Sequence, residues 1–300
     1  MPTAPLPVRD GLNPTRLRLP GDDSWSTVLE YLLARFPDDT TRLLEKVAAA
    51  EVVDGAGRPV TATTVFRPHT FVFLYRDPPV EARVPFEVTV LHRDENLLVV
   101  DKPHFLASTP RGRYVAESAL VRLRRDLDLP ELTPAHRLDR VTAGVLVFTV
   151  RAQVRGAYQS LFEQHLVSKE YEAVAGHDPA LALPRTVRSR IVKERGSIQA
   201  VEVPGEPNAE TRIELLEVSG HRARYRLLPR TGKMHQLRVH LSSLGIPIVG
   251  DDFYPDLHDV PPDDYSNPLQ LLARSLTFDD PLTGEGRTFT SARRLTGMDQ

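Results

Sequence analysis

The 300-residue sequence contains no cysteine, one tryptophan and only five lysines, at positions 46, 102, 169, 193 and 233. The lack of cysteine excludes disulfide bonds, thiol nucleophiles, iron–sulfur clusters and most structural zinc sites, and it is typical of a reducing cytoplasm, where we expect the protein. No apolar run approaches the roughly 18 residues of a membrane span, and the first 20 residues lack the apolar centre of a signal peptide. We therefore expect neither secretion nor membrane association.

The formal net charge is only −2, which taken alone argues against a nucleic-acid-binding protein. The charges are unevenly distributed, however. Arginine accounts for 33 of the 38 basic residues, and residues 218–250 contain no Asp or Glu while they carry a local charge of +6. An aspartate-rich stretch follows, from Asp251 to Asp264. Guanidinium groups suit phosphates and base edges, so the basic segment predicts an anionic partner, with a GC-rich genome as the alternative explanation for the arginines.

Residues 1–80 predict a small α+β domain behind a proline-rich arm. The first 20 residues show no apolar periodicity, and we expect a loose arm. Ser24 is expected to cap a helix with apolar residues at 29, 32, 33 and 36, and a second helix follows around 43–47. Short strands are expected at 52–53 and 71–75, and residues 76–79 are interpreted as a linker to the main domain, residues 81–300.

Residues 81–300 predict one large α+β domain built on a large sheet. The run at 144–150 is apolar throughout, as in a strand that is buried on both faces. Helices are expected at 117–127, 154–162 and 234–244, the first with Arg122, Arg124 and Arg125 on its polar side. Strands are expected at 88–91, 97–100, 144–150, 171–175, 187–192, 211–218 and 222–228, with a C-terminal hairpin that turns at 281–284.

The densest polar cluster is His136–Arg137–Leu138–Asp139–Arg140, directly before the apolar run. Two flanking arginines favour the charged form of the Asp139 carboxyl, which suits a nucleophile or electrostatic stabiliser better than a general acid. The structural alternative is an aspartate that caps the turn and pairs with Arg137. His235 and His240 are five residues apart rather than the four of a helical zinc pair, so no metal is expected.

Four segments resemble, in the same order, the motifs of the RluA-type pseudouridine synthases. The first family motif is matched by LLVVDKPHFLAS, and the central motif is matched by PAHRLDRVTAGVLVFTV. The strand that follows in the family is matched by KEYEAVA, and the last motif is matched by LLPRTGKMHQLRVHLSSLGIPIVGDDFY. The resemblance covers roughly residues 86–278 and implies a catalytic domain with a large mixed, mainly antiparallel sheet flanked by helices. Two positions depart from the pattern: Ala143 replaces a serine, and Lys233 replaces an arginine, which keeps the charge but loses bidentate phosphate binding.

The resemblance implies a cofactor-free isomerase that detaches uracil from ribose at N1 in an RNA and reattaches it through C5. Asp139 matches the catalytic aspartate, and attack on ribose C1′ and a glycal route both stay open. Arg137 matches the arginine that replaces the flipped base, Tyr171 the tyrosine that stacks on it, and Arg238 the basic partner of the aspartate. The residues expected to contact RNA are Lys102, Arg140, Arg222, Arg224, Arg230, Lys233 and His235.

The sequence leaves two other functions open. A catalytically idle RNA-binding or ribosome-assembly factor would bind RNA without needing Asp139, and a glycosidase would need a second carboxylate that the motifs do not offer. The motifs do not define the target, rRNA or tRNA, because it depends on RNA shape. Many relatives carry a small α-L RNA-binding domain; residues 24–76 match its outline without its basic helix, so we expect a degenerate version. RNA is the expected partner of a monomeric protein.

Overall fold

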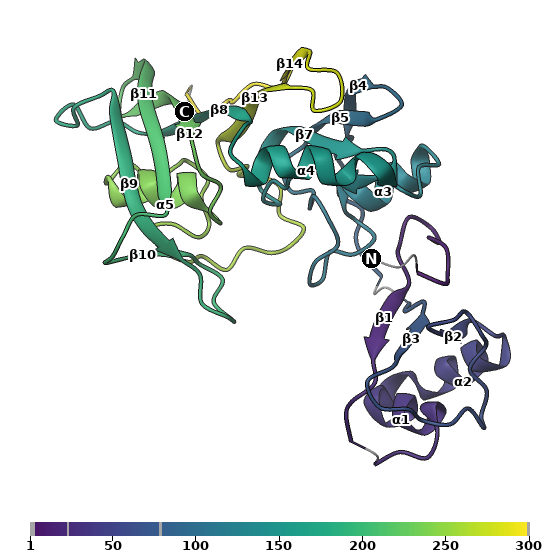
Figure 1. Ribbon diagram of the computed structural model, residues 1–300. Helices are drawn as coiled ribbons and strands as arrows, with labels where there is room; N and C mark the ends of the chain where they lie inside the picture. Colours follow the sequence, from purple (N-terminus) through teal and green to yellow (C-terminus); the bar gives the residue numbers. More distant parts are fainter. Residues whose placement is uncertain (1–3, 23, 78–79, 299–300) are drawn as a thin grey trace. The chain divides into compact units, whose positions relative to one another are not determined.

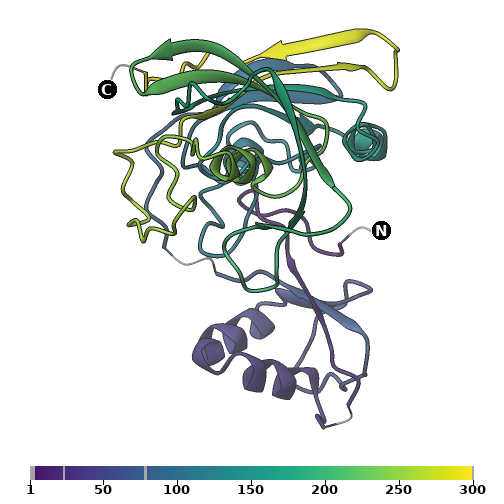
Figure 2. The ribbon, with the colours of Figure 1, turned by 90° about the vertical axis from the view of Figure 1, so that its left-hand side faces the viewer.

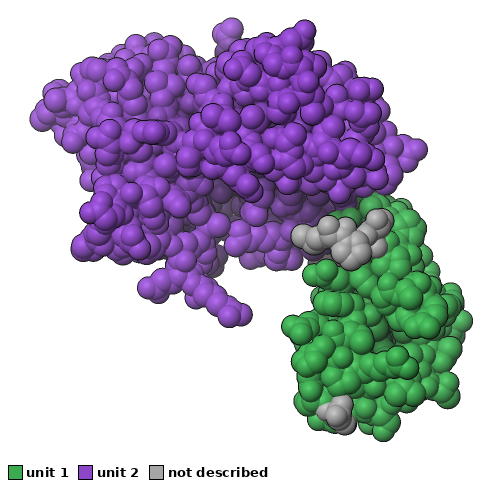
Figure 3. Space-filling view, viewed as in Figure 1, with its two compact units in different colours: residues 1–80 green, residues 81–300 purple. Residues whose placement is uncertain are grey.

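The computed structural model describes residues 4–22, 24–77 and 80–298 (Figure 1). The chain forms two compact units, residues 1–80 and 81–300, which Figure 3 colours separately. Part of the expected linker (Pro78 and Pro79) and the start of the expected arm (residues 1–3) lie outside the described residues. All candidate site residues belong to the larger unit.

The smaller unit packs two helices with a three-stranded sheet. The strand order is β1-β3-β2, with antiparallel pairing on both sides of β3. The helices and the sheet share a core of apolar side chains that includes Leu32, Leu43, Val52 and Val72. The elements are β1 (Thr15–Arg18), α1 (Val28–Arg35), the 3-10 helix η1 (Pro37–Asp39), α2 (Thr40–Ala48), β2 (Val52–Asp54) and β3 (Phe71–Leu74).

Two predictions for this unit were wrong. Residues 15–18 form β1 rather than part of a loose arm, because they pair along the whole length of β3. Thr27, not Ser24, caps α1: its hydroxyl accepts a hydrogen bond from the Glu30 N–H at 3.1 Å, and the Glu30 carboxylate accepts one from the Ser26 N–H at 2.8 Å. This reciprocal pair satisfies two backbone donors at the start of the helix.

The larger unit is built on one sheet of eleven strands, in the order β10-β9-β11-β12-β8-β13-β7-β5-β4, with β14 on β13 and β6 on β7. The pairing of β13 with β7 is parallel and the others are antiparallel, so the prediction of a mixed, mainly antiparallel sheet is confirmed. The strands are β4 (Thr89–Arg93), β5 (Leu97–Lys102), β6 (Thr133–Pro134), β7 (Ala143–Thr149), β8 (Ser168–Gly176), β9 (Arg185–Val192), β10 (Val201–Val203), β11 (Ala209–Ser219), β12 (Arg222–Pro229), β13 (Leu271–Asp279) and β14 (Gly286–Thr290).

Helices cover both faces of this sheet. α3 (Ala119–Asp126) and α5 (Gln236–Ser243) pack on the face to which β7 contributes Leu146 and Phe148. α4 (Arg155–Glu163), which follows the 3-10 helix η2 (Ala152–Val154), packs on the face of Val145 and Val147. Figure 1 shows α5 against β9 and β11, and Figure 2 shows it end-on next to the sheet. β7 is therefore buried on both faces, as its apolar run predicts.

Two of the arginines expected on the polar side of α3 are buried. Arg122 donates to the carbonyl oxygens of Val84 and Phe86 at 2.6 and 2.8 Å. Arg124 donates to the carbonyl oxygen of Leu132 at 3.0 Å. The prediction was wrong because these guanidinium groups satisfy backbone acceptors of the segments that pack beside the helix.

Gly144 fixes the crossing of β7 and β13. Its φ is +116°, and a Cβ at this position would lie 2.2 Å from the carbonyl oxygen of Ala273. Glycine alone adopts this backbone conformation without strain and allows so close an approach. The parallel ladder is limited to two residue pairs at this crossing, and the loop that carries Asp139 lies directly before it.

Candidate active site

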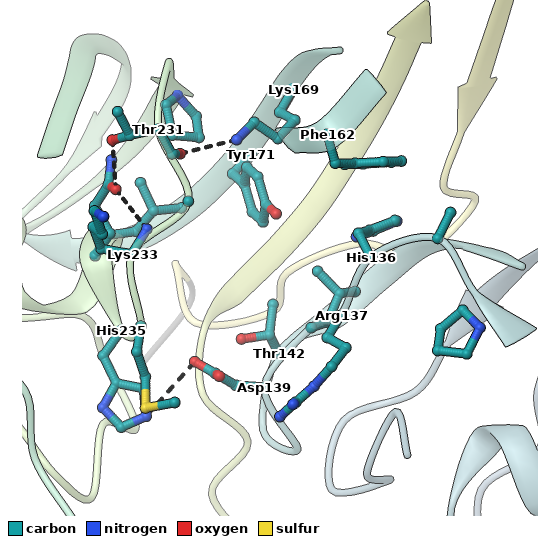
Figure 4. Close-up of a pocket in the computed structure, with 18 of the residues that line it drawn as sticks. His136, Arg137, Asp139, Thr142, Phe162, Lys169, Tyr171, Thr231, Lys233 and His235 are labelled. Atoms are coloured by element: carbon teal, nitrogen blue, oxygen red, sulfur yellow. Dashed lines mark hydrogen bonds and ion pairs between the residues drawn. The ribbon is translucent and has the colours of Figure 1, made fainter. Parts of the chain in front are cut away.

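One pocket of the larger unit brings together residues that are far apart in the sequence. Its volume is about 730 Å³, within the usual range for small-ligand sites. Its walls come from the loop before β7, from α4, from β8 and from the segment that leads into α5 (Figure 4). Six of the side chains expected from the sequence line it: Arg137, Asp139, Tyr171, Lys233, His235 and Arg238.

Asp139 lies in a turn whose backbone is fixed by hydrogen bonds. The Thr142 N–H donates to the carbonyl oxygen of Asp139 at 3.1 Å and closes the turn. The buried Ser108 hydroxyl donates to the Leu138 carbonyl oxygen at 2.7 Å and accepts from the Leu138 N–H at 3.1 Å. The Asp139 side chain itself stays 36% exposed, so its carboxylate is open to the pocket.

His235 is one of the ionisable neighbours of this carboxylate. Its Nε2 atom lies 3.9 Å from Oδ2 of Asp139, and its Nδ1 atom lies 2.9 Å from the hydroxyl of Tyr254. Desolvation on burial brings the pKa of His235 below its ordinary value, against the raising effect of the Asp139 charge. His235 was expected to contact RNA, and the structure places it between Asp139 and Tyr254.

Arg238 pairs with Asp251 rather than with Asp139. Its side chain is almost fully buried, and Nε and Nη2 lie 2.8 and 2.5 Å from the two carboxylate oxygens of Asp251. The predicted contact with Asp139 was wrong because Asp251 is buried beside α5 rather than part of a surface acidic stretch. Burial lowers the pKa of Arg238, but Asp251 and, more weakly, the charge of Asp139 raise it above its ordinary value.

Tyr171 and Arg137 supply an aromatic face and an exposed cation beside Asp139. Tyr171 projects from β8, with its hydroxyl toward the part of the pocket that Asp139 and Thr142 border (Figure 4). Burial, with a contribution from the Asp139 charge, raises the pKa of Tyr171, so its phenol is neutral. Arg137 is exposed, and among the described residues no acidic group lies within ion-pair distance of it.

Lys169 also lines the pocket, although the sequence motifs do not indicate it. Its Nζ donates to the carbonyl oxygen of Thr231 at 2.9 Å, and burial lowers its pKa to about 8. Lys169 lies two positions before Tyr171 on β8, so the two-residue period of a strand could have indicated it. With the exposed Lys233 it adds positive charge to the wall of the pocket opposite Asp139 (Figure 4).

Lys102 and Arg140 lie outside the pocket lining. Lys102 is fully buried and donates to three backbone carbonyl oxygens, including that of Arg140 at 3.2 Å. Its assignment as an RNA contact was wrong, because no part of the side chain reaches the surface. The guanidinium of Arg140 lies over the rings of Phe105 and Tyr114, 5.7 and 4.9 Å from their centroids.

Arg222 and Arg224, also expected to contact RNA, lie on the face of the sheet opposite Tyr171. In the ladder between β12 and β8, Leu227 pairs with Tyr171 and shares its face. Alternate residues of a strand point to opposite faces, so the arginines at 222 and 224 point away from it. Arg230, directly after β12, is exposed and does not line the pocket.

Acidic side chains and a backbone carbonyl outside residues 218–250 also contact arginines of that +6 segment. Arg224 lies 2.8 Å from Glu217 of β11, and Arg226 lies 3.2 Å from Glu170 of β8. Arg222 donates to the carbonyl oxygen of Gly297 at 2.6 Å. The prediction of a basic surface centred on these arginines was wrong, because antiparallel pairing places glutamates beside them.

His240 does not join His235 in a metal site. Its Nδ1 lies 2.9 Å from the hydroxyl of Thr211, and its Nε2 lies 3.1 Å from that of Ser189. In the part of the chain that the structure describes, no group of three or more His, Cys, Asp or Glu side chains is placed to hold a metal ion. None of the helices described there has the length and apolar character that crossing a membrane requires.

Comparison with known proteins agrees with this site. Residues 96–243 match the RNA pseudouridylate synthase family. The dual-specificity RNA pseudouridine synthase RluA of Salmonella typhi is 35% identical over 207 residues, which cover 67% of this chain and 91% of that protein. An uncharacterised RNA pseudouridine synthase of Synechocystis sp., slr1592, is 31% identical over 201 residues, covering 66% of this chain and 69% of that protein.

Solved structures of RNA pseudouridylate synthases are also similar to this chain. Human RNA Pseudouridylate Synthase Domain Containing 4 matches 70% of this chain and 89% of its own chain, with a TM-score of 0.53 and 28% identity. A second human structure, RNA Pseudouridylate Synthase Domain Containing 1, matches 71% of this chain and 86% of its own with a TM-score of 0.57, and at 23% identity it supports the fold. The chain therefore belongs to the RluA-type RNA pseudouridine synthases, isomerases that convert uridine in RNA to pseudouridine.

Proposed function

We propose that the protein modifies specific uridines of structured ribosomal or transfer RNA, with Asp139 as the catalytic carboxylate. The observation that carries the proposal is the pocket in which an accessible carboxylate, an unpaired arginine and a neutral tyrosine meet. Its volume of about 730 Å³ accommodates one nucleotide, and its remaining cations favour the flanking phosphates.

The pocket receives a uridine that has left the base stack. Extruding a base costs a few kcal/mol, and its glycosidic bond reaches Asp139 only after extrusion. Stacking of the base on the Tyr171 ring contributes about 1–3 kcal/mol and offsets this cost. Arg137, which is exposed beside Asp139, fills the place that the base leaves in the RNA.

The isomerisation consumes no second substrate. The bond between N1 and ribose C1′ breaks, the uracil turns, and a bond between C5 and C1′ forms while the C5 proton is lost and N1 gains one. Positive charge develops on the sugar as N1 departs, and the Asp139 carboxylate stabilises it. Covalent attack on C1′ and a glycal route both use this carboxylate at the sugar.

Replacement of Asp139 by asparagine tests the proposal. Asp139→Asn keeps the shape of the side chain and removes the charge, so we expect loss of pseudouridine formation with RNA binding retained. Asp38→Asn, at an exposed position of the smaller unit, is the matched control and should leave the rate unchanged. Mapping pseudouridines in RNA from wild-type, deletion and Asp139→Asn strains would also identify the target.

The alternative is a catalytically idle RNA-binding or ribosome-assembly factor. It predicts that the deletion strain keeps every pseudouridine and that RNA affinity is indifferent to Asp139. Persistence of all sites in the Asp139→Asn strain would therefore refute the catalytic proposal.

We further propose that the protein acts as a cytoplasmic monomer and that residues 24–76 are a degenerate α-L-type domain with weak RNA affinity. Cell fractionation, light scattering, and RNA binding by the full chain and by a variant without residues 1–80 test these three points.

A further inference from the structure

We propose that the sheet of the smaller unit binds a single-stranded segment of RNA on the face that carries Arg16, Arg18, His69 and Phe71, which we call the arginine face. The arginines come from β1, which precedes residues 24–76, so this surface lies outside the helices of the α-L-type domain. The inference goes beyond the proposed function and rests on it only in that the partner is an RNA.

The arginine face follows from the alternation of β1. The smaller unit has helices on one side of its sheet only (Figure 2). Leu17 of β1 and Val72 of β3 pack in the core that the sheet shares with these helices. Alternate residues of a strand point to opposite faces, so Arg16 and Arg18 point away from the helices. The register places Arg18 directly opposite Phe71, and residues so paired share a face.

The chain before β1 covers the other end of this face. The Tyr75 hydroxyl donates to the Pro7 carbonyl oxygen at 2.6 Å, and the Arg9 guanidinium lies over the Tyr75 ring, 3.9 Å from its centroid. Tyr75 is buried there, whereas the two arginines of β1 are exposed and Phe71 is partly exposed. The end of the face that holds Phe71 is therefore accessible to a partner.

The two arginines have no acidic neighbour that neutralises them. Arg16 lies over the Phe71 ring, 4.8 Å from its centroid, and Arg18 donates to Nδ1 of His69 at 3.2 Å. Within the described residues, no carboxylate lies at ion-pair distance from either guanidinium. Four other basic side chains of this unit are in ion pairs: Arg9 with Glu51, Arg42 and Lys46 with Asp77, and Arg58 with Asp54. The positive charge of the arginine face is thus left for an anionic partner.

The chemistry of the face fits a single strand of RNA better than a duplex. Unpaired bases stack on aromatic rings and on guanidinium planes, and phosphates accept hydrogen bonds from guanidinium groups. Phe71 gives Arg16 a defined position for both contacts. Residues two apart in a strand are about 6.6 Å apart along it, so Arg16 and Arg18 can contact neighbouring phosphates of an extended strand. A duplex offers phosphates but no base faces for stacking.

The helical side of the unit repeats the contact between arginine and an aromatic ring, but beside carboxylates. Arg35 and Arg76 both lie over the Phe36 ring, each 5.3 Å from its centroid. Asp39 and Asp77 line the same small hollow as Phe36 and Arg76. Carboxylates repel phosphates, so this cluster is not expected to bind RNA. It supplies the matched control.

Charge reversal in the full-length protein tests the proposal. The probe is an oligouridylate of about 12 nucleotides, within the range that small single-strand-binding folds cover. We expect Arg16→Glu/Arg18→Glu to weaken binding on the order of tenfold at low salt. The slope of log affinity against log salt concentration should fall by about 1.4, because each phosphate contact of a single strand contributes about 0.7. Arg35→Glu/Arg76→Glu should change the affinity and the slope little.

Phe71→Leu separates stacking from charge. Leucine keeps an apolar side chain on β3 and removes the ring beneath Arg16. We expect the affinity to fall on the order of fivefold, with an unchanged salt slope because no charge is lost. Thermal melting identifies a temperature at which all variants are folded. Wild-type affinity of Phe71→Leu at that temperature would overturn the stacking contact.

Wild-type affinity of Arg16→Glu/Arg18→Glu, or an equal loss in Arg35→Glu/Arg76→Glu, would overturn the proposal. Wild-type affinity together with a lower melting temperature of Arg16→Glu/Arg18→Glu would overturn it too, and would show that the face packs within the protein.

Oligouridylate binding does not require isomerisation, so this proposal and the proposed function can fail separately. An inactive Asp139→Asn, with wild-type binding by Arg16→Glu/Arg18→Glu, would uphold the proposed function and refute the arginine face. An active Asp139→Asn, with weakened binding by Arg16→Glu/Arg18→Glu, would do the reverse.

Discussion

Replacing Arg238 by methionine tests whether this arginine serves the fold or the chemistry. Methionine keeps the length of the side chain but leaves the fully buried Asp251 carboxylate without its bidentate partner. The carboxylate keeps two hydrogen bonds, from the N–H groups of Phe253 and Tyr254 at 2.9 and 3.1 Å. Breaking one side of a buried ion pair costs about 3–5 kcal/mol, because a charge is left unpaired in the interior. For a unit of this size, that lowers the melting temperature by roughly 6–20 °C.

The double variant Arg238→Met/Asp251→Asn removes the unpaired charge, and we expect it to recover about half of the lost stability. Urea denaturation of the four proteins gives the coupling free energy between the two residues. Single-turnover pseudouridine formation, measured well below the lowest melting temperature, gives the effect on the chemistry. An Arg238→Met protein with wild-type stability and the rate of Asp139→Asn would refute this reasoning, since it would place Arg238 at the proposed catalytic carboxylate, as the family resemblance implies.

Two further predictions concern acid stability and RNA binding. The Nε2 atom of His136 accepts the Val147 N–H at 3.2 Å, and burial lowers the pKa of His136 to about 3. The unfolded chain binds a proton below about pH 6.5 that the native state does not, so stability falls by up to about 1.4 kcal/mol per pH unit as the pH drops toward 4. Urea denaturation of His136→Gln should show a shallower fall with pH, and equal slopes would contradict an imidazole that stays neutral in the folded protein. Lys233→Glu should weaken RNA binding, and it should reduce the slope of log affinity against log salt concentration by roughly one for each phosphate that Lys233 neutralises. Arg224→Glu, on the opposite face of the sheet, should change the RNA affinity little. If filter-binding assays gave the same decrease in affinity for both variants, the two faces would contribute alike.

The alternation of β12 could be predicted from the sequence, but its surroundings could not. Ala223, Tyr225 and Leu227 face the core, and the arginines between them face the other side, as a two-residue period requires. The charge of that second face depends on which strands pair with β12 and in which register. Glu170 lies in β8 and Glu217 directly precedes the counted residues, so the count of charge along residues 218–250 did not include them.

The candidate site, too, could be predicted from the sequence only in part. The motifs placed Asp139, Arg137 and Tyr171 in one site, and the structure brings all three to one pocket. The partner of Arg238 was predicted wrongly because residues 236–241 of α5 are all buried, which leaves this guanidinium no solvated face. Its ion pair depends on how the chain folds back after the helix, and no local pattern encodes the position of Asp251.

Lys102 shows why a basic residue close to the proposed catalytic carboxylate need not contact RNA. It is fully buried, and desolvation lowers its pKa to about 7, although the nearby Asp139 charge raises it. Its hydrogen bond to the Arg140 carbonyl oxygen, with the two bonds of Ser108 to Leu138, fixes the backbone on both sides of Asp139. A bidentate arginine would instead occupy both oxygens of the carboxylate and hold them away from the sugar. Because the main chain of the turn fixes its position, the carboxylate keeps its oxygens available for the nucleotide in the proposed reaction.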